Sequence, residues 1–304
     1  MVNLRKSEKI SVLRGGISEE KEISVLTANQ VYKTLQKKYE TTLIDVDNDC
    51  NKLIKNLISS KPDKVFNCLH GVVGEDGQIQ SILNYLRIPY THSGVLASSI
   101  AMNKVVSKYF YKAVGIRFPK NFDINDKFTK SSYPFIIKPI CGGSSKNLFK
   151  IENQKQLIDF KNIHINELHM YMVEEFIDGR ELTVGILNDK ICGIMEIIFD
   201  SEIYDFKNKY KVIAKHVLDP KLPEIAIKSL RNISLKIHKA INCKCISRLD
   251  FRYNTKSDEL FLLEINTQPG LTKNSLLPEM AQSNGINFLE LCEILLSNAE
   301  CEVL

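Results

Sequence analysis

The stretch RLDFRYNTKSDELFLLEINTQPG, residues 248–270, has the pattern of a β-hairpin that carries polar groups where a core strand would carry aliphatic ones. Two apolar runs flank the polar segment 254–258, whose Asn, Ser and Asp residues are typical of a hairpin turn. Asp250, Glu264 and Asn266 interrupt those runs. Buried carboxylates need a cation or solvent to compensate them, so this patch calls for an explanation.

The register of the hairpin decides whether these groups meet. Side chains alternate across a strand, so Glu264 and Asn266 share one face of the second strand. Arg248 and Asp250 share one face of the first strand in the same way. A turn centred near Lys256 would place Arg248 opposite Glu264, with Asp250 diagonal to it. All four side chains would then project from one side of the sheet, whereas a slip of one residue would separate them.

Two interpretations fit this polar patch. Two carboxylates and an amide are hard oxygen donors of the kind that bind Mg2+. An ion pair from Arg248 to Glu264 on an open sheet face would explain the same charges without a metal. The Pro-Gly turn at 269–270 can offer backbone N–H groups to an anion, and this favours a binding site.

The rest of the chain alternates strand and helix patterns, which predicts an α/β protein. Over about the first 90 residues, single strands and amphipathic helices follow one another, as in a Rossmann-like parallel sheet. Strands are expected at 9–16, 41–46, 64–71, 134–139, 148–151, 169–177, 182–187 and 190–198. Helices are expected at 18–38, 51–60, 77–87, 98–104, 104–115, 153–162, 223–241 and 288–300, with a polar loop at 201–221.

Length and composition are those of an ordinary globular chain. The 304 residues suggest two or three domains, and the net charge of +5 is scattered rather than clustered as in nucleic-acid-binding proteins. The first ten residues lack an apolar signal segment, and the apolar stretch 191–199 is too short to span a membrane. Eight cysteines without a CxxC pair are typical of reduced thiols. We therefore expect a cytoplasmic protein with neither nucleic acid nor membrane as a partner.

Two N-terminal loops place acids and glycines next to helix starts, where open α/β sheets bind ligands. In GGISEEKE (15–22), a carboxylate suits an ammonium-bearing ligand, and Glu20 is the candidate. The structural alternative is Ser18 acting as an N-cap. In LHGVVGEDG (69–77), His70 is a candidate functional histidine, with a buried structural histidine as the alternative.

Two later stretches have the composition of a nucleotide site. In IIKPICGGSSKN (136–147), Lys138 ends a strand before a Gly-Gly-Ser-Ser loop that could close over a phosphate. No GxxxxGK[ST] motif occurs, so this is not a P-loop, and a simple turn is the alternative. VEEFIDGRE (173–181) ends a strand with acids that could hold adenine and ribose, or it could be an interdomain hinge.

Eight stretches of the chain, taken together and in order, resemble the D-alanine–D-alanine ligases of the ATP-grasp superfamily. They are GGISEEKEIS, LHGVVGEDG, PYTHSGVLASSIAMNK, FIIKPICGGSS, EEFIDGRELTV, YDFKNKY, RLDF and LLEINTQPGLTKNSLLP, and they run from residue 15 to 278. The resemblance implies an α/β fold in which a Rossmann-like N-terminal (pre-ATP-grasp) domain precedes a two-lobed ATP-grasp fold. The implied domains are an N-terminal substrate-binding domain at 1–95, a central lobe at 96–180 and a C-terminal lobe with the metal site at 181–304.

The resemblance also implies a reaction and its cofactors. One D-alanine carboxylate would attack the γ-phosphate of ATP, and the amine of a second D-alanine would displace phosphate from the acyl phosphate. The product, D-alanyl-D-alanine, is a peptidoglycan precursor. Asp250, Glu264 and Asn266 would bind two Mg2+ ions, for which Mn2+ can substitute. Arg248 and the Gly270 N–H would stabilise an oxyanion, and family members are usually homodimers.

Other site residues carry over from the family's motifs position by position. Glu20, Ser144 and Tyr210 would form a hydrogen-bonded triad that couples two loops over the active site and excludes water. The implied ATP-binding residues are Lys104 and Lys138 for the phosphates, Ser145 in the glycine loop, Glu174, Glu175 and Ile177 for adenine, Glu181 for ribose, and Lys209 for the γ-phosphate. The implied substrate-binding residues are Glu20, His70, Arg248, Gly270, Ser275 and Leu276.

Two departures from the family pattern stand in this sequence. Asn147 replaces a glycine of the phosphate loop, which asparagine can do because it tolerates positive φ. Ser247 replaces the usual Gly or Ala before Arg248. Tyr210 favours D-alanine over D-lactate or D-serine as the second substrate, although a ligase for either remains the nearest alternative. A nucleotide-binding module without catalysis is another alternative, and the absence of GxGxxG argues against an NAD-dependent dehydrogenase.

Overall fold

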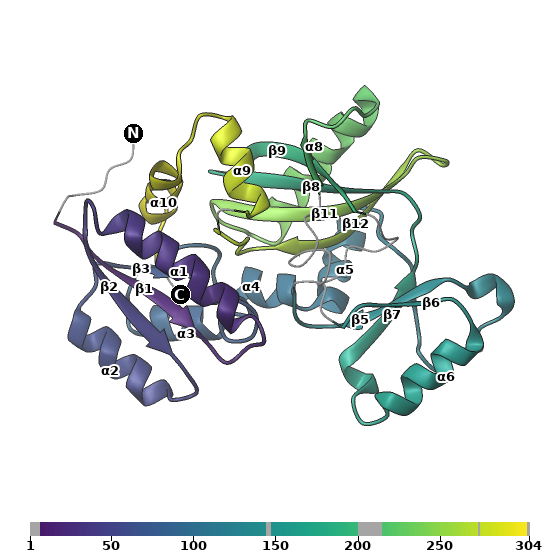
Figure 1. The fold of residues 1–304 in the computed structure, drawn as a ribbon, viewed down its shortest axis with the longest axis horizontal. Helices are drawn as coiled ribbons and strands as arrows, with labels where there is room; N and C mark the ends of the chain where they lie inside the picture. Colours follow the sequence, from purple (N-terminus) through teal and green to yellow (C-terminus); the bar gives the residue numbers. More distant parts are fainter. Residues whose placement is uncertain (1–6, 144–146, 200–214, 273, 303–304) are drawn as a thin grey trace.

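The computed structural model describes residues 7–143, 147–199, 215–272 and 274–302, and builds them into three sheets flanked by helices (Figure 1). The first sheet is parallel and has the order β2-β1-β3. Parallel strands end at one edge of their sheet, so the loops that follow β1 and β3 lie beside each other. The elements of this unit are β1 (Lys9–Gly15), α1 (Lys21–Leu35), β2 (Glu40–Val46), α2 (Cys50–Ser60), β3 (Lys64–Asn67) and α3 (Gln78–Tyr85).

The second sheet is small and antiparallel, with the order β4-β7-β5-β6. Phe135 and Ile137 of β5 pack against Leu157 and Phe160 of α6, so this helix covers one face and leaves the other for the rest of the molecule. Helices α4 (Val95–Met102) and α5 (Lys104–Ala113) lead into it. Its elements are β4 (Asn121–Phe122), β5 (Phe135–Pro139), β6 (Phe149–Ile151), α6 (Gln154–Ile163) and β7 (Tyr171–Glu175).

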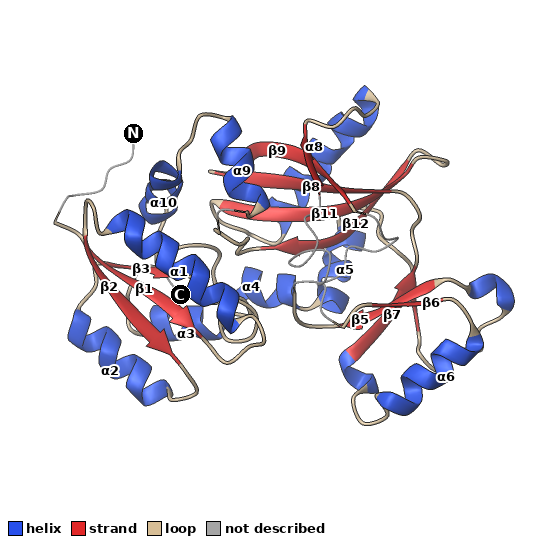
Figure 2. Ribbon diagram, in the orientation of Figure 1, coloured by secondary structure: helices blue, strands red, loops and turns tan. Residues whose placement is uncertain are grey.

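The third sheet is antiparallel, has the order β10-β9-β8-β11-β12, and lies above the second sheet in Figure 2. Its aliphatic face, with Val184 and Leu249, packs against Leu230 and Ile237 of α8. Helix α9 packs on the other face, where Gly193 leaves room for Met280. The elements are β8 (Arg180–Leu187), β9 (Lys190–Ile198), β10 (Lys215–Leu218), α8 (Glu224–Ala240), β11 (Ile246–Asn254), β12 (Glu259–Asn266) and α9 (Leu276–Ser283).

The last helix, α10 (Phe288–Ser297), returns to the first sheet (Figure 1). Leu291 and Leu295 of α10 share a buried cluster with Ile10 and Val12 of β1. The backbone of Glu300 then pairs with that of Tyr90. The N-terminal unit is therefore completed by residues from the far end of the sequence. Within the described ranges, no helix is long and apolar enough to cross a membrane.

Several expected elements need correction. The expected polar loop at 201–221 contains a strand, β10, whose four residues pair with β9 along the sheet edge. β3 ends at Asn67, so His70 belongs to the following loop rather than to the strand. The expected strand at 169–177 begins at Tyr171, because a short 3-10 turn takes up the residues before it. Helix α9 was not expected at all.

The register of the β11–β12 hairpin also differs from the expected one. Arg248 lies opposite Asn266, and Asp250 lies opposite Glu264. The turn is longer than assumed, since Asn254 pairs with residue 259, and a bulge after Asp250 adds one further residue. The two shifts together amount to two residues, so all four polar side chains still share one face of the sheet.

Candidate active site

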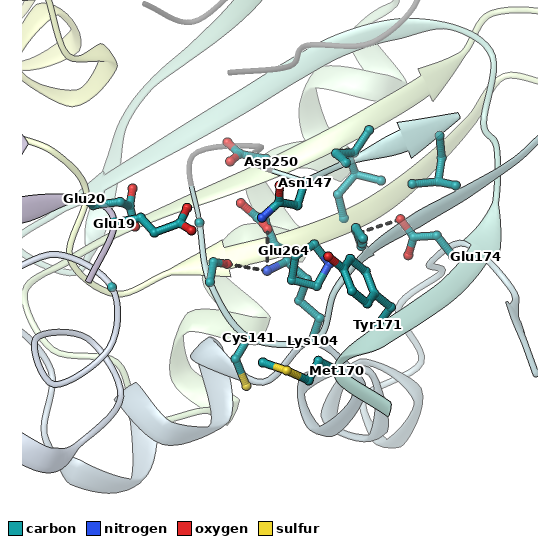
Figure 3. A pocket seen from close by; sticks show the side chains of 18 of the residues that line it. Glu19, Glu20, Lys104, Cys141, Asn147, Met170, Tyr171, Glu174, Asp250 and Glu264 are labelled. Carbon is teal, nitrogen blue, oxygen red and sulfur yellow. Dashed lines mark hydrogen bonds and ion pairs between the residues drawn. The ribbon is translucent and has the colours of Figure 1, made fainter. Parts of the chain in front are cut away.

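A pocket of about 550 Å³ opens between the second and third sheets and reaches the loop after β1. Figure 3 shows Lys104, Glu174, Asp250 and Glu264 around it, with Glu20 approaching from the N-terminal unit. A cavity of this size can enclose a small organic ligand. The predicted site residues that line the pocket are Glu20, Lys104, Lys138, Glu174, Glu175, Ile177, Glu181, Arg248, Asp250, Glu264 and Leu276.

The polar patch of the hairpin faces this pocket. Arg248 Nη2 donates to Asp250 Oδ2 at 2.7 Å, and Arg248 Nε donates to Asp250 Oδ1 at 3.0 Å. Glu264 Oε2 lies 3.6 Å from Lys104 Nζ. Arg248 thus pairs with Asp250 rather than with Glu264, so the ion pair expected from the sequence has a different partner, and each carboxylate has a cation beside it. The two carboxylates remain side by side because they are direct cross-strand partners.

Lys104 lies between this patch and the glycine loop after β5. Its Nζ donates to Gly142 O at 2.5 Å, and its backbone N–H donates to Ile140 O at 3.0 Å. The Asn103 side chain caps the first turn of α5 by accepting two of its backbone N–H groups. The cap and the loop contacts together hold a cation against the pocket. Asn147, at the far end of the loop, has φ of 56° as its residue type allowed.

Glu174, on the second sheet, is held between two lysines. Its Oε1 lies 2.5 Å from Lys138 Nζ, and its Oε2 lies 2.7 Å from Lys108 Nζ. Burial acts to raise the pKa of Glu174, but the two ammonium groups outweigh burial and hold the pKa below its usual range. Sequence reasoning missed Lys108. Its position one helical turn after Lys104, on the same face of α5, was the available signal.

Glu181 and Arg252 form an ion pair in the wall formed by the third sheet. Arg252 Nε lies 2.7 Å from Glu181 Oε2, and Arg252 Nη1 donates to Gly179 O at 2.9 Å. Burial raises the pKa of Glu181 to about 7, against the lowering effect of Arg252 and with a smaller raising effect from Asp250. Sequence reasoning missed Arg252 as well, although the two-residue period from Asp250 places it on the pocket face.

The loops that follow β1 and β3 carry Glu20 and His70, of which Glu20 lines the pocket and His70 does not. The Ser18 hydroxyl donates to His70 O at 2.6 Å and accepts the Glu20 N–H at 3.2 Å. Glu20, rather than Ser18, is the N-cap residue of α1, so the N-cap interpretation of Ser18 is wrong. The His70 ring lies 2.9 Å from Glu75 Oε1 and 3.4 Å from Thr27 Oγ1. Both ring nitrogens have protein partners, as the structural alternative expects.

The chain is similar to known ligases along nearly its whole length. A family described as "D-ala D-ala ligase C-terminus" matches residues 97–297. A D-alanine–D-alanine ligase of Wolbachia pipientis wMel is 40% identical over 298 residues, which cover 95% of this chain and 94% of that protein. Another, from Pelagibacter ubique, is 41% identical over 307 residues, with 96% and 98% covered. The chain belongs to the D-alanine–D-alanine ligase family.

The solved structures of this family agree with the fold. A crystal structure of a D-alanine–D-alanine ligase from Bacillus anthracis, complexed with ATP, has a TM-score of 0.82 and 28% identity. The match covers 96% of this chain and 97% of that chain. These similarities confirm the predicted family, the α/β fold class and the D-alanine–D-alanine ligase activity.

In this ligase, the loop after β12 connects the third sheet to the first. Gln268 Oε1 accepts a hydrogen bond from Asn67 Nδ2 at 2.8 Å, and Gln268 Nε2 donates to Leu69 O. Gly270 follows, where an added Cβ would lie 3.0 Å from Ser275 Oγ. Gln268 is the third residue that sequence reasoning missed. Its partners lie in the N-terminal unit, about 200 positions earlier, so no local pattern indicates them.

The remaining predicted site residues fall into two groups. His70, Asn266, Gly270 and Ser275 lie close to pocket residues in the sequence but are not among those that line the pocket. Ser144, Ser145, Lys209 and Tyr210 lie outside the described residues. The triad of Glu20, Ser144 and Tyr210 therefore stays a prediction, as do the domain boundaries at 95/96 and 180/181.

Proposed function

We propose that the pocket binds ATP between the second and third sheets and joins two D-alanine molecules at the end that faces the first sheet. The observation that carries this proposal is the convergence of Lys104, Lys138 and Arg248 with Asp250 and Glu264 in one cavity. Cations and acids arranged together can neutralise a triphosphate and hold a divalent metal beside it. The ATP complex of the Bacillus anthracis relative supports the choice of nucleotide.

The nucleotide would extend along the pocket from the cations to the second sheet. Lys104 and Lys138 would bind phosphate oxygens as point charges. Glu181, in the opposite wall, would accept hydrogen bonds from the ribose hydroxyls. The adenine-edge residues would be Glu174, Glu175 and Ile177 at the end of β7, while Ser145 and Lys209 are proposed from the sequence alone.

The donor set of the hairpin fits Mg2+. Asp250 of β11 and Glu264 of β12 are direct partners on neighbouring strands. Asn266 lies on the same face of β12 as Glu264. Mg2+ binds oxygen ligands and usually combines one or two carboxylates with substrate phosphates. The hairpin supplies two carboxylates, and its third donor is the amide of Asn266. A metal site made of three or more His, Cys, Asp or Glu side chains does not occur in the described ranges. We assign the three residues to two Mg2+ ions, or Mn2+, which would neutralise phosphate charge when bound.

The residues would divide the two-step reaction between them. In the first step, a carboxylate oxygen of one D-alanine forms a bond to the γ-phosphorus, and the bond to ADP breaks. In the second, the amine of another D-alanine attacks the acyl carbon, loses a proton, and expels phosphate. Glu20 would bind the ammonium of the first D-alanine. Arg248 and the Gly270 N–H would stabilise the oxyanion, and Ser275 and Leu276 would bind the second carboxylate.

Phosphate release from Mg-ATP tests this function. D-alanine, D-lactate, D-serine and L-alanine are supplied singly and in pairs, and products are identified by mass. We expect release with D-alanine alone, together with the mass of D-alanyl-D-alanine. Release that requires D-alanine with D-lactate would contradict the second substrate inferred from Tyr210. No release in any mixture, while ATP still binds, would favour a nucleotide-binding module without catalysis.

We further propose that this ligase is a homodimer and acts in the cytoplasm, where ATP is available. The family resemblance supports the dimer. Light scattering on the purified protein measures its mass directly, and the mass of a single chain would contradict the dimer.

A further inference from the structure

We infer that Lys108 is a positioning residue of the nucleotide site, which keeps the Glu174 carboxylate charged and in place when Lys138 turns to the phosphates of ATP. This inference rests on the proposed function of the pocket. It starts from an asymmetry between the two lysines that share Glu174. Lys138 lines the pocket, whereas Lys108 lies behind Glu174 and does not line it.

All three donors of the Lys108 ammonium are engaged within the protein. Its Nζ donates to Pro119 O at 2.9 Å, to Asn121 Oδ1 at 2.5 Å and to Glu174 Oε2 at 2.7 Å. The side chain is 3% exposed and passes over the ring of Phe118. An ammonium has three donors, so Lys108 has no capacity left for a phosphate. Of its three partners, Glu174 is the one that lines the pocket, so we expect Lys108 to act on the nucleotide through this carboxylate.

Lys138 is placed to exchange partners. It lies at the pocket surface, and its Nζ is 2.5 Å from Glu174 Oε1. The flexible side chain of a lysine allows its ammonium to leave this carboxylate for a phosphate oxygen. That movement would free Oε1 of Glu174 to accept a hydrogen bond from the adenine amino group. The exchange couples recognition of the base to binding of the phosphates.

The exchange requires a second counter-ion for Glu174. A buried carboxylate without a paired cation is strongly destabilised, because desolvation is then uncompensated. Burial acts to raise the pKa of Glu174, and the two lysines together hold it low. If Lys108 were replaced by a neutral residue, Lys138 would be the one lysine left in contact with Glu174 among the described residues. The charge of Glu174 would then keep Lys138 at the carboxylate and away from the phosphates.

Three variants test this role. Lys108→Met removes the charge at similar length, Lys108→Met with Glu174→Gln removes both charges, and Lys112→Met is the control. Lys112 lies one turn further along α5 and is exposed. We expect Lys108→Met to raise the KM for ATP at least about tenfold and to lower kcat, with the KM for D-alanine within about twofold. Lys112→Met should match the wild type.

The double variant separates positioning from a merely structural role. Glu174→Gln no longer attracts Lys138 as a charged partner, so the double variant should regain several-fold of the kcat lost in Lys108→Met. A double variant no faster than Lys108→Met would overturn the inference. So would a Lys108→Met variant whose KM for ATP equals that of the wild type.

Two further measurements test the inference even if the wild type is inactive or the Lys108→Met variant does not fold. Calorimetric titration with ATP tests Lys108 even if the wild type releases no phosphate, a result that would contradict the proposed function alone. If Lys108→Met does not fold, a crystal structure of the wild type with Mg2+ and a non-hydrolysable ATP analogue decides. We expect Lys138 Nζ on a phosphate oxygen and Lys108 Nζ still on Glu174. Lys138 remaining on Glu174, or Lys108 having left it, would overturn the inference.

Discussion

Glu264 and Asp250 line the pocket and are the carboxylates that we propose as metal ligands. Glu264→Gln keeps the shape of the side chain but removes one negative charge from the proposed metal site. Loss of a metal-binding charge should cost several kcal/mol of transition-state stabilisation, so we expect kcat to fall at least about a hundredfold. Phosphate release measured over a Mg2+ titration checks this, and circular dichroism should show an unchanged fold.

Glu259→Gln is the matched control for that variant. Glu259 lies on the same strand, pairs with Arg117, and is not among the residues that line the pocket. Its substitution should leave kcat within about twofold, as expected for a surface ion pair. Glu264→Gln activity within a few-fold of the wild type would show that the hairpin does not hold the metal.

Burial of Glu181 gives the site a predicted dependence on pH. The pKa of Glu181 is about 7, so its carboxylate becomes charged as pH rises through neutrality and is then a better acceptor for ribose hydroxyls. The KM for ATP should therefore fall as pH rises from about 6 to 8. Arg252→Met removes the cation that lowers this pKa, so the same fall should occur at higher pH. Profiles of KM for ATP against pH measure both.

Arg180→Met controls for the loss of an arginine from the same sheet. Arg180 pairs with Glu196 through two contacts of 2.7 Å, and neither residue lines the pocket. Its pH profile should overlay that of the wild type. If the Arg252→Met profile also overlays it, then Glu181 does not bind the nucleotide in its charged form.

Single residues were predictable where their chemistry is local. Asp250, Glu264 and Arg248 stand out because they break apolar runs at a two-residue period, and the pocket contains all three. Lys108 could not be predicted in this way, because its role depends on contact with Glu174, which is 66 positions away. A lysine in an amphipathic helix resembles any solvated lysine until its partner is known.

Elements were predictable to the extent that their patterns are long and regular. The β11–β12 hairpin was expected, but its register was not, because turn length and a bulge each shift pairing by one residue. β10 has only the four residues Lys215–Leu218, too few for a pattern to separate a strand from a polar loop. The four polar side chains still share one face of the sheet, because the two register shifts add to two residues and side chains alternate with a period of two.

At the scale of the whole molecule, the site depends on contacts between units that no segment reveals alone. Gln268 is 2% exposed and joins the loop before Gly270 to Asn67 and Leu69 of the N-terminal unit. Gln268→Met keeps the bulk but leaves buried polar groups without their partner. We expect a loss of about 1–3 kcal/mol in the free energy of unfolding and a raised KM for D-alanine. Urea titration and steady-state kinetics measure the two effects.

The affinity for ATP should stay unchanged in Gln268→Met, because we propose that the nucleotide binds between the other two sheets. Gln282→Met, an exposed position on α9, should match the wild type in every respect. Equal losses of ATP and D-alanine affinity in Gln268→Met would point to general unfolding and contradict the specific link.

The return of α10 to β1 has a consequence for how the protein is made. Val12 is synthesised long before Leu295, which shares its buried cluster. During that interval α1, whose Ala28, Val31 and Leu35 belong to the same cluster, covers only part of this face. The part that awaits α10 is exposed to chaperones and to misassembly. The first sheet, which is translated before the other two, is thus among the last to complete its core.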